Sequence, residues 1–455
     1  MARKNIDMCN GALYKNLWIY TFPIMLTGIL SLLFNAADLI VVGRFCGKLS
    51  VAAVGATNAL SQIIVNLFAG FSVGVSVTVA QAIGAKNKDE IHKAVHTAIP
   101  TALICGLILM AIGLIFSDTL LKLTSTPNDI IKLSSTYLKI YFCGMPFSLL
   151  YNYGAAVYRA SGDSKTPLIF LATSGIVNVI LNIFFVTVFN MNVAGVALAT
   201  AISQGLSAFL VLRGLIKRND DCKFIIKDSK IYKNCLFKIL GIGFPAGLQS
   251  SLFAISNTII QASVNSFGSI AISGNAAASS IEGFVYVGMD ASSNTCLNFT
   301  GANYGASNLD RIKKVALYTS INTTISGFVL GFGSFLIARP LLSIYLGNAT
   351  DAIEYGVTRM FYIGILYFIC GVMNTVGASM RGIGKSQIPL IITLLGACGL
   401  RILWIFTVFQ IPAYHTLPCL FLSWPISWTI TTLAEIPFLL HYYKNLKKRF
   451  AKRNI

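Results

Sequence analysis

Long apolar segments with almost no charge are the feature that most limits what this chain can fold into. Runs such as 104–116 and 168–189 reach or approach the roughly 20 residues that cross a bilayer as a helix. Charged residues make up 11% of the 455 residues, whereas a soluble domain carries about 25%. These charges gather between the apolar runs. The chain is therefore expected to be an all-α integral membrane protein.

Twelve such segments follow one another along the chain. They are expected near residues 15–40, 50–76, 94–116, 131–158, 167–190, 192–216, 240–262, 270–297, 315–338, 355–380, 388–410 and 415–441. The segment around the first of them lacks the small-residue cleavage site of a secretory signal, so it is expected to remain as the first helix. Ten cysteines show no CxxC or Cys/His spacing, so neither a metal site nor a disulfide framework is expected.

The formal charge of +19 follows the membrane topology. Most lysines and arginines fall in every second connection, in the basic loop 223–238 and in the C-terminal tail, whereas the alternate connections hold few. This asymmetry is the positive-inside rule. It predicts a multi-pass protein of the cytoplasmic membrane with both termini in the cytoplasm. It also argues against a nucleic-acid partner, since the basic residues are spread over one side of a bilayer.

An internal repeat divides the chain into two halves. Phe22-Pro23 recurs as Phe244-Pro245, and the offset of 222 residues also separates two asparagines and four positions of a loop. These further pairs are Asn35 and Asn257, Arg159 and Arg381, Gly162 and Gly384, Ser164 and Ser386, and Pro167 and Pro389.

Six spans separate equivalent points, so both halves run in the same direction through the membrane, as parallel repeats do. The predicted organisation is an N-lobe over residues 1–216, a cytoplasmic linker over 217–238, a C-lobe over 239–443 and a basic tail over 444–455. Two six-helix lobes leave a natural cleft between them, and their rocking would open either side in turn. This architecture favours a transporter over a channel or a membrane enzyme.

Several motifs in order resemble those of multidrug and toxic compound extrusion (MATE) transporters. In the first half they are the segments 35–43, 52–55, 81–85, 159–167 and 194–200, and in the second half they are 301–306 and 381–389. The resemblance covers residues 15–445 and implies a twelve-helix, two-lobed fold with alternating access. It also implies transport coupled to an ion gradient without a further cofactor, and the chain contains no GxxxxGK[ST] nucleotide motif.

Few carboxylates fall inside the predicted spans. A charged group costs free energy inside a membrane, so each of these carboxylates is a candidate for a functional role. They are Asp38, Glu282, Asp290 and Glu435. The four histidines lie near span ends or in loops, which argues against a histidine proton relay.

Asp38 is the strongest candidate for an ion-binding residue. Asn35 shares its helix face, and Asn178 and Asn182 share a face of the fifth span. With Thr200 of the sixth span, these side chains could bind Na⁺ through oxygens or hold a protonated aspartic acid. The alternative is a structural polar cluster that joins three helices through hydrogen bonds.

The resemblance implies roles for the same residues. In one branch of the family the N-lobe holds the cation, on the aspartate equivalent to Asp38, with a threonine equivalent to Thr200. The helix-5 pattern of that branch is Asn-x-x-x-Asp, and Asn182 replaces its acid here. Pro23 matches a proline that lets the first helix bend. The acids that the other branch places in helices 7 and 10 are absent, and the C-lobe position equivalent to Asp38 is Ile260.

The C-lobe is expected to hold a charge cluster of Glu282, Asp290 and Arg401, with a link between Glu282 and Arg401. Two interpretations remain open, a fixed ion pair and a protonation switch or counter-charge for substrate. Aromatic and methionine side chains that suit flat organic cations are Tyr141, Met145, Tyr286 and Met289, although such residues are also ordinary packing in membrane proteins.

The sequence as a whole predicts a secondary active efflux antiporter. We expect it to act as a monomer in the lipid bilayer and to export small organic cations in exchange for H⁺ or Na⁺. A lipid-linked oligosaccharide flippase of the same superfamily is the alternative. No nucleophile–base pair indicates an enzyme.

Overall fold

The computed structural model describes residues 5–124 and 126–452, with only the backbone described at 58–60. In these residues the regular elements are all helices. A helix satisfies its own backbone hydrogen bonds, which is what an apolar solvent requires of a spanning segment. Nine of the described helices are long and apolar enough to cross a membrane, and the bent pair 350–364 and 367–382 forms a tenth candidate.

The two remaining predicted spans correspond to a broken helix and to one more polar helix. These are α4 (Ile131–Cys143) with α5 (Met145–Ala160), and α9 (Ser269–Gly305). Gly144 and Pro146 lie at the break between α4 and α5. The prediction of twelve membrane helices is confirmed.

The chain divides into two compact units. Unit 1 comprises Met1–Asp7 and Leu26–Ser251, and unit 2 comprises Met8–Met25 and Leu252–Ile455. The division falls within α1 (Leu13–Val41) and within α8 (Lys233–Asn265), so each of these helices contributes to both units. The lobe boundaries proposed from the sequence, at 216 and 239, stay a prediction.

Unit 1 is built from α1 to α8. Its remaining elements are η1 (Val42–Cys46), α2 (Lys48–Gly84), α3 (Lys88–Leu123), α6 (Lys165–Thr187), α7 (Asn192–Ile216) and η2 (Ile226–Asp228). Helices α2, α3, α5 and α7 pack around an apolar core, where large side chains such as Leu109, Phe142 and Tyr153 have no exposed surface.

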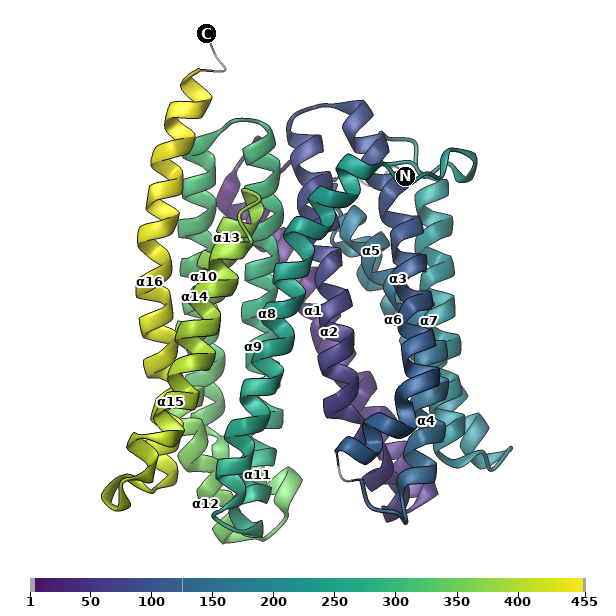
Figure 1. Ribbon diagram of the computed structural model, residues 1–455, viewed down its shortest axis with the longest axis vertical. Coiled ribbons are helices and arrows are strands. Elements are labelled where there is room, and N and C mark those ends of the chain that lie inside the picture. Colours follow the sequence, from purple (N-terminus) through teal and green to yellow (C-terminus); the bar gives the residue numbers. More distant parts are fainter. Residues whose placement is uncertain (1–4, 125, 453–455) are drawn as a thin grey trace. The chain divides into compact units, whose positions relative to one another are not determined.

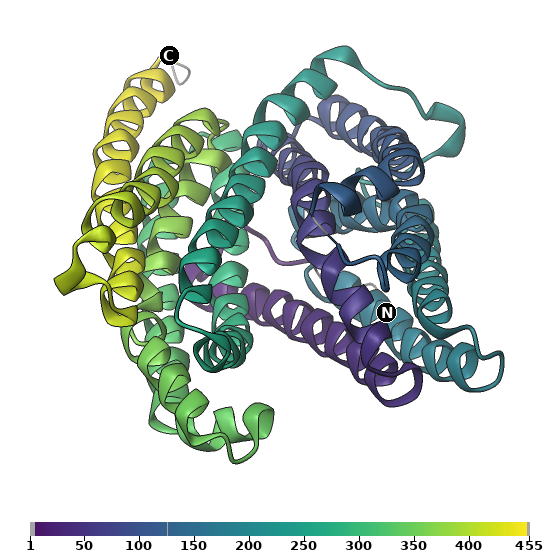
Figure 2. The same ribbon diagram turned by 60° about the horizontal axis from the view of Figure 1, so that its bottom comes forward.

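Unit 2 is built from α9 to α16, together with the first part of α1 up to Met25 and the last part of α8 from Leu252. Its remaining elements are α10 (Leu309–Leu336), α11 (Ala338–Leu346), α12 (Thr350–Arg359), η3 (Met360–Gly364), α13 (Tyr367–Gly382), α14 (Gln387–Thr393), η4 (Leu394–Gly399), α15 (Leu400–Phe406), η5 (Val408–Gln410), η6 (Pro412–Tyr414) and α16 (Leu417–Ala451). Within this unit α10 and α13 both pack on α9, and α16 packs on α13 (Figure 1). The short helices α11 and α12 lie together at one end of the unit (Figure 2).

Two helices of unit 2 contain π-helical turns. The segment η3 joins α12 to α13, and η4 joins α14 to α15. A π-turn adds one residue to the helical repeat, so it rotates the side chains that follow it, and such turns are frequent at functional sites. Both π-turns flank an arginine, Arg359 before η3 and Arg401 just after η4.

The backbone carries the same duplication as the sequence. Gly162 and Gly384, 222 positions apart, adopt φ values of 84° and 83°, and Gly47 and Gly268, 221 positions apart, adopt 85° and 88°. These left-handed conformations favour glycine because a side chain is strained there. In unit 1 the added Cβ of an alanine at Gly162 would also lie 2.2 Å from the Ile6 carbonyl oxygen.

Glycines let two helices of unit 1 cross with their backbones in contact. Gly70 and Gly74 of α2 face Gly243 and Gly247 of α8, and both pairs have the small-xxx-small spacing that suits close helix packing in membranes. A Cβ on Gly247 would lie 2.1 Å from the Leu67 carbonyl oxygen. The crossing therefore depends on the absence of side chains.

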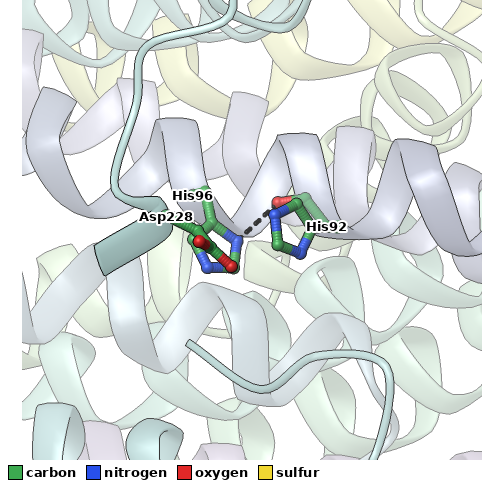
Figure 3. A group of neighbouring side chains, drawn as sticks. All are labelled: His92, His96 and Asp228. Atoms are coloured by element: carbon green, nitrogen blue, oxygen red, sulfur yellow. Dashed lines mark hydrogen bonds between the residues drawn. The ribbon is translucent and has the colours of Figure 1, made fainter. Parts of the chain in front are cut away.

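The connection between α7 and α8 is docked on unit 1. The ring of His96 on α3 has no exposed surface; its Nδ1–H donates to the His92 carbonyl oxygen (2.8 Å), and its Nε2 accepts the backbone N–H of Ile225 (3.0 Å). Figure 3 shows both rings beside Asp228 of η2. Cys222 packs in the same core, and burial raises the pKa of its thiol to about 12. This basic connection is thus an ordered part of the fold.

We predict that Gly247→Leu destabilises the protein. Overpacking costs about 1–3 kcal/mol, so the thermal unfolding midpoint of the purified chain should fall and the yield of monodisperse protein should drop. The control is Gly241→Leu in the same helix, because a Cβ on Gly241 meets nothing within 4 Å. Equal midpoints for the two variants would contradict the crossing.

We predict that His96→Ala loosens the connection. Loss of the Ile225 hydrogen bond, about 1 kcal/mol, should raise trypsin cleavage after Lys223, Lys227 or Lys230 about fivefold. The comparison is His92→Ala, which keeps the backbone carbonyl to which His96 donates. Cleavage of both variants at the wild-type rate would show that His96 does not anchor this segment.

Candidate functional site

Two helices of unit 1, α6 and α7, bring polar side chains to Asp38, which lies one turn before the end of α1. Asn182 of α6 donates through Nδ2 to Oδ1 of Asp38, and Thr200 of α7 donates to Oδ2 at 3.4 Å. Among the residues described, no lysine, arginine or histidine lies within 4 Å of this carboxylate. Asp38 is thus held by neutral donors alone.

Asn178 completes the cluster. Its Nδ2 donates to the Thr200 hydroxyl at 3.4 Å, and its Oδ1 accepts from Asn182 at 3.3 Å. Asn178 and Asn182 are 4% and 0% exposed. The Asn182 Oδ1 atom is buried and accepts no hydrogen bond within the described part of the chain. Burying such an acceptor costs free energy, which a bound cation would recover.

The donor set suits a hard monovalent cation or a proton. Carboxylate, amide and hydroxyl oxygens are the ligands that hard cations prefer. They converge here because Asn178 and Asn182 are one turn apart on α6 and face both α1 and α7. No sulfur or imidazole belongs to this cluster, which argues against a site for zinc or copper.

Two further residues expected in or near this site behave differently. Asn35 is exposed and makes no hydrogen bond to Asp38 among the described residues. Pro23 lies inside α1, which continues through it as one helix from Leu13 to Val41. A role for Pro23 in bending stays a prediction.

The four aromatic and methionine residues proposed for substrate contact fall into two groups. Met145 and Met289 have no exposed surface and are packed inside their units. Tyr141 stacks on Tyr137, with ring centroids 6.1 Å apart. Tyr286 is 38% exposed and lines a cavity in unit 2.

The predicted link between Glu282 and Arg401 is wrong. Glu282 of α9 instead pairs with Arg359 of α12: Nη2 donates to Oε2 at 2.7 Å, and Nε lies 3.1 Å from Oε1. Arg359 also donates through Nη1 to Asn275 Oδ1 at 2.6 Å. Both side chains of the ion pair are buried, so removing either partner would leave an unpaired charge.

Arg401 is buried, and no carboxylate lies within 4 Å of it among the residues that the structure describes. Its Nε donates to the Ser427 hydroxyl at 2.8 Å, and its guanidinium lies 5.4–5.8 Å from the ring centres of Phe253, Trp424 and Trp428. Its Nη2 has no hydrogen-bond partner within the described residues. Asp290, the third member of the expected cluster, accepts from Asn294 at 2.9 Å.

Arg359 is the residue that the sequence reasoning missed. It lies in a predicted span, and the count of charges inside spans covered the acids without the arginines. An arginine within an apolar segment is as expensive as an acid and needs a partner as much. Counting the basic residues inside the spans as well as the acids would have given Glu282 two candidate partners, Arg359 and Arg401.

A third grouping looks like a metal site by distance. Possible ligand atoms of His92, His96 and Asp228 lie within 4.8 Å of one another (Figure 3). A carbonyl oxygen only accepts and a backbone N–H only donates, so both ring nitrogens of His96 are already used. An ion could bind here only by breaking the bond to Ile225. The geometry favours the structural role.

Comparison with known proteins supports the duplicated architecture. The sequence model of the MatE family matches residues 23–184 and 245–407, two segments that begin 222 positions apart. The probable multidrug resistance protein YoeA of Bacillus subtilis is 27% identical over 400 residues, 86% of each chain. The multidrug export protein MepA of Staphylococcus aureus is 24% identical over 370 residues, covering 80% of this chain and 82% of MepA.

Solved structures share the fold. A MOP superfamily transporter from Pyrococcus furiosus superposes with a TM-score of 0.91 at 20% identity, over 98% of this chain and 99% of that one. A MATE crystal structure in the bent conformation gives 0.88 at 21% identity, over 99% and 100%. With the two family matches spanning most of the sequence, these findings show that the chain belongs to the MatE family of membrane transporters.

Proposed function

We propose that this protein is an efflux antiporter that exports organic cations in exchange for H⁺ or Na⁺ across the cytoplasmic membrane. The observation that carries the proposal is Asp38, a carboxylate held by Asn182 and Thr200 with no basic partner within the described part of the chain. Similar proteins are named as multidrug resistance or multidrug export proteins, which fits such a substrate range. Most basic residues occupy alternate connections, which supports an orientation with both termini in the cytoplasm.

The proposed ion site works through charge neutralisation. An ionised Asp38 is costly in an apolar environment, and a proton or Na⁺ removes most of that cost. An ion shifts a conformational equilibrium only if it binds one conformation more tightly than the other. In the proposed mechanism, the empty site and the occupied site therefore favour different conformations of the carrier. In the proposed cycle, ion entry at Asp38 resets the carrier after the substrate has left.

The replacement of an acid by Asn182 has a consequence for stoichiometry. The cluster around Asp38 holds one carboxylate, with Asn178, Asn182 and Thr200 as neutral oxygen ligands. One negative charge is neutralised by one monovalent cation. We therefore propose a single ion at this site in each cycle.

We predict that Asp38→Asn abolishes coupled transport. Proteoliposomes containing the full chain should expel a fluorescent organic cation under an imposed H⁺ or Na⁺ gradient, and the variant should lower this rate at least about tenfold. The reason is that an amide carries no negative charge to bind H⁺ or Na⁺. A tenfold effect corresponds to a loss of about 1.4 kcal/mol of ion-binding free energy. The gradient that drives wild-type efflux identifies the coupling ion.

The matched control for this experiment is Asp118→Asn. Asp118 lies in the same unit, and its carboxylate pairs with Lys139 at 2.7 Å where its side chain is 55% exposed. This variant should transport at the wild-type rate, since exposed pairs contribute little. Gradient-driven efflux by Asp38→Asn at the wild-type rate would refute the proposed site.

A further inference from the structure

Two surface hollows of unit 2 adjoin each other where α10 begins and α16 ends. Their volumes are about 480 and 500 Å³, and Lys313 of α10 and Lys447 of α16 belong to both walls. The first wall also includes residues 306–310, and the second also includes Leu440 and Lys444. Helices α10 and α16 pack on each other (Figure 1), so the two hollows form one α10–α16 groove between them.

The α16 side of the groove is a single face of that helix. Leu440, Lys444 and Lys447 recur at the i, i+4, i+7 spacing that brings side chains together on a helix surface. The adjacent face is buried in the core of unit 2 through Leu439, Tyr443, Leu446 and Phe450. Because this buried face anchors the helix, the groove face is held toward Lys313 of α10.

The groove lies where both helices leave the apolar part of their spans. Residues 417–443 of α16 contain no lysine or arginine, whereas 444–449 contain four. In α10 the order is reversed, since 311–314 contain three basic residues and 315–336 carry no charge. Leu440 is 59% exposed, and about 10 Å of helix separates it from Lys447. An exposed apolar side chain thus lies beside lysines, as an acyl chain lies beside the phosphate of a phospholipid.

The lysines of the groove are not engaged by carboxylates of the fold. Among the described residues, Lys313, Lys444 and Lys447 form no ion pair. Asp310 is the acid of the described wall, and its carboxylate lies more than 4 Å from each of these ammonium groups. The three ammonium groups can therefore receive an anionic ligand without breaking an ion pair.

The arginines beside the groove serve the fold instead. Arg311 donates to the carbonyl oxygens of Asn10 at 2.8 Å and Gly11 at 3.1 Å. Arg449 donates to the Tyr304 hydroxyl at 2.9 Å. These bonds tie the chain before α1 to α10, and α16 to α9. The basic residues thus divide into arginines that hold segments of unit 2 together and lysines that face the groove.

We propose that the α10–α16 groove binds one anionic phospholipid. Lys313, Lys444 and Lys447 would surround its phosphate, and the start of an acyl chain would lie along Leu440. Basic hollows between helices at the ends of spans suit phospholipid headgroups. Three lysines against Asp310 favour a lipid with a net negative charge over a zwitterionic one. The inference is independent of the proposed ion exchange, because none of these residues belongs to the Asp38 cluster.

The competing explanation is a general attraction between basic helix ends and an anionic membrane surface. In that case every exposed lysine at this end of the unit contributes alike. Lys314 and Lys448 distinguish the two explanations, because each directly follows a groove lysine in the chain and is exposed. Neither of them lines the groove. Removing this pair changes the net charge by the same amount as removing Lys313 and Lys447.

The test is native mass spectrometry of the purified full chain with dioleoylphosphatidylglycerol or dioleoylphosphatidylcholine. The wild type should retain one phosphatidylglycerol about tenfold more strongly than phosphatidylcholine, because only the first lipid carries a net charge. Lys313→Gln combined with Lys447→Gln should weaken phosphatidylglycerol binding about 25-fold, at about fivefold for each lysine. The control, Lys314→Gln combined with Lys448→Gln, should bind within about twofold of the wild type.

Equal losses in the two double variants would overturn the site in favour of general surface attraction, as would equal retention of both lipids by the wild type. If a double variant does not fold, Lys444→Gln provides the same test with a loss of about fivefold. Leu440→Asn tests the apolar half and should also weaken phosphatidylglycerol binding about fivefold. Unchanged binding in Leu440→Asn, or displacement of the lipid by excess glycerol 3-phosphate, would indicate a site for a free phosphate ester and overturn the assignment to a lipid.

Discussion

A charge buried in an apolar solvent must find a partner, and this constraint organises both units of the protein. Glu282 and Arg359 meet it by forming an ion pair from two helices, with Asn275 as a further acceptor. Asp38 and Arg401 meet it only with neutral groups. Partially satisfied charges are costly, so they are where a bound ion or ligand contributes most free energy.

The two repeats have diverged in the sign of the charge they retain. The position equivalent to Asp38 in the second half is Ile260, which is 1% exposed and apolar. Arg401 corresponds to Val179 in the first half, and Arg359 to Tyr137. Among the described residues, the duplicated scaffold thus carries a carboxylate with no basic group within 4 Å in unit 1 and a guanidinium with no acid within 4 Å in unit 2. This divergence is the physical basis for proposing the ion site in unit 1.

The sequence predicted the helices well because bilayer length and backbone satisfaction leave few alternatives. It also placed Asn178, Asn182 and Thr200 near Asp38, and the structure joins these four residues by hydrogen bonds. The sequence prediction failed for the ion-pair partner of Glu282. That partner depends on how η3 and η4 rotate Arg359 and Arg401 around their helices. A π-turn has no clear signature in a single sequence. The short helix α11 was missed because it is too brief for a periodic pattern.

The most direct test of the central claim is ion binding by the purified protein without any transported substrate. Titration calorimetry with Na⁺, and proton uptake measured in weakly buffered solution, would count the ions bound by the wild type and by Asp38→Asn. The account predicts one Na⁺ or one H⁺ per wild-type chain that the variant does not bind. The same number of ions bound by both proteins would contradict the assignment of Asp38 as the coupling residue.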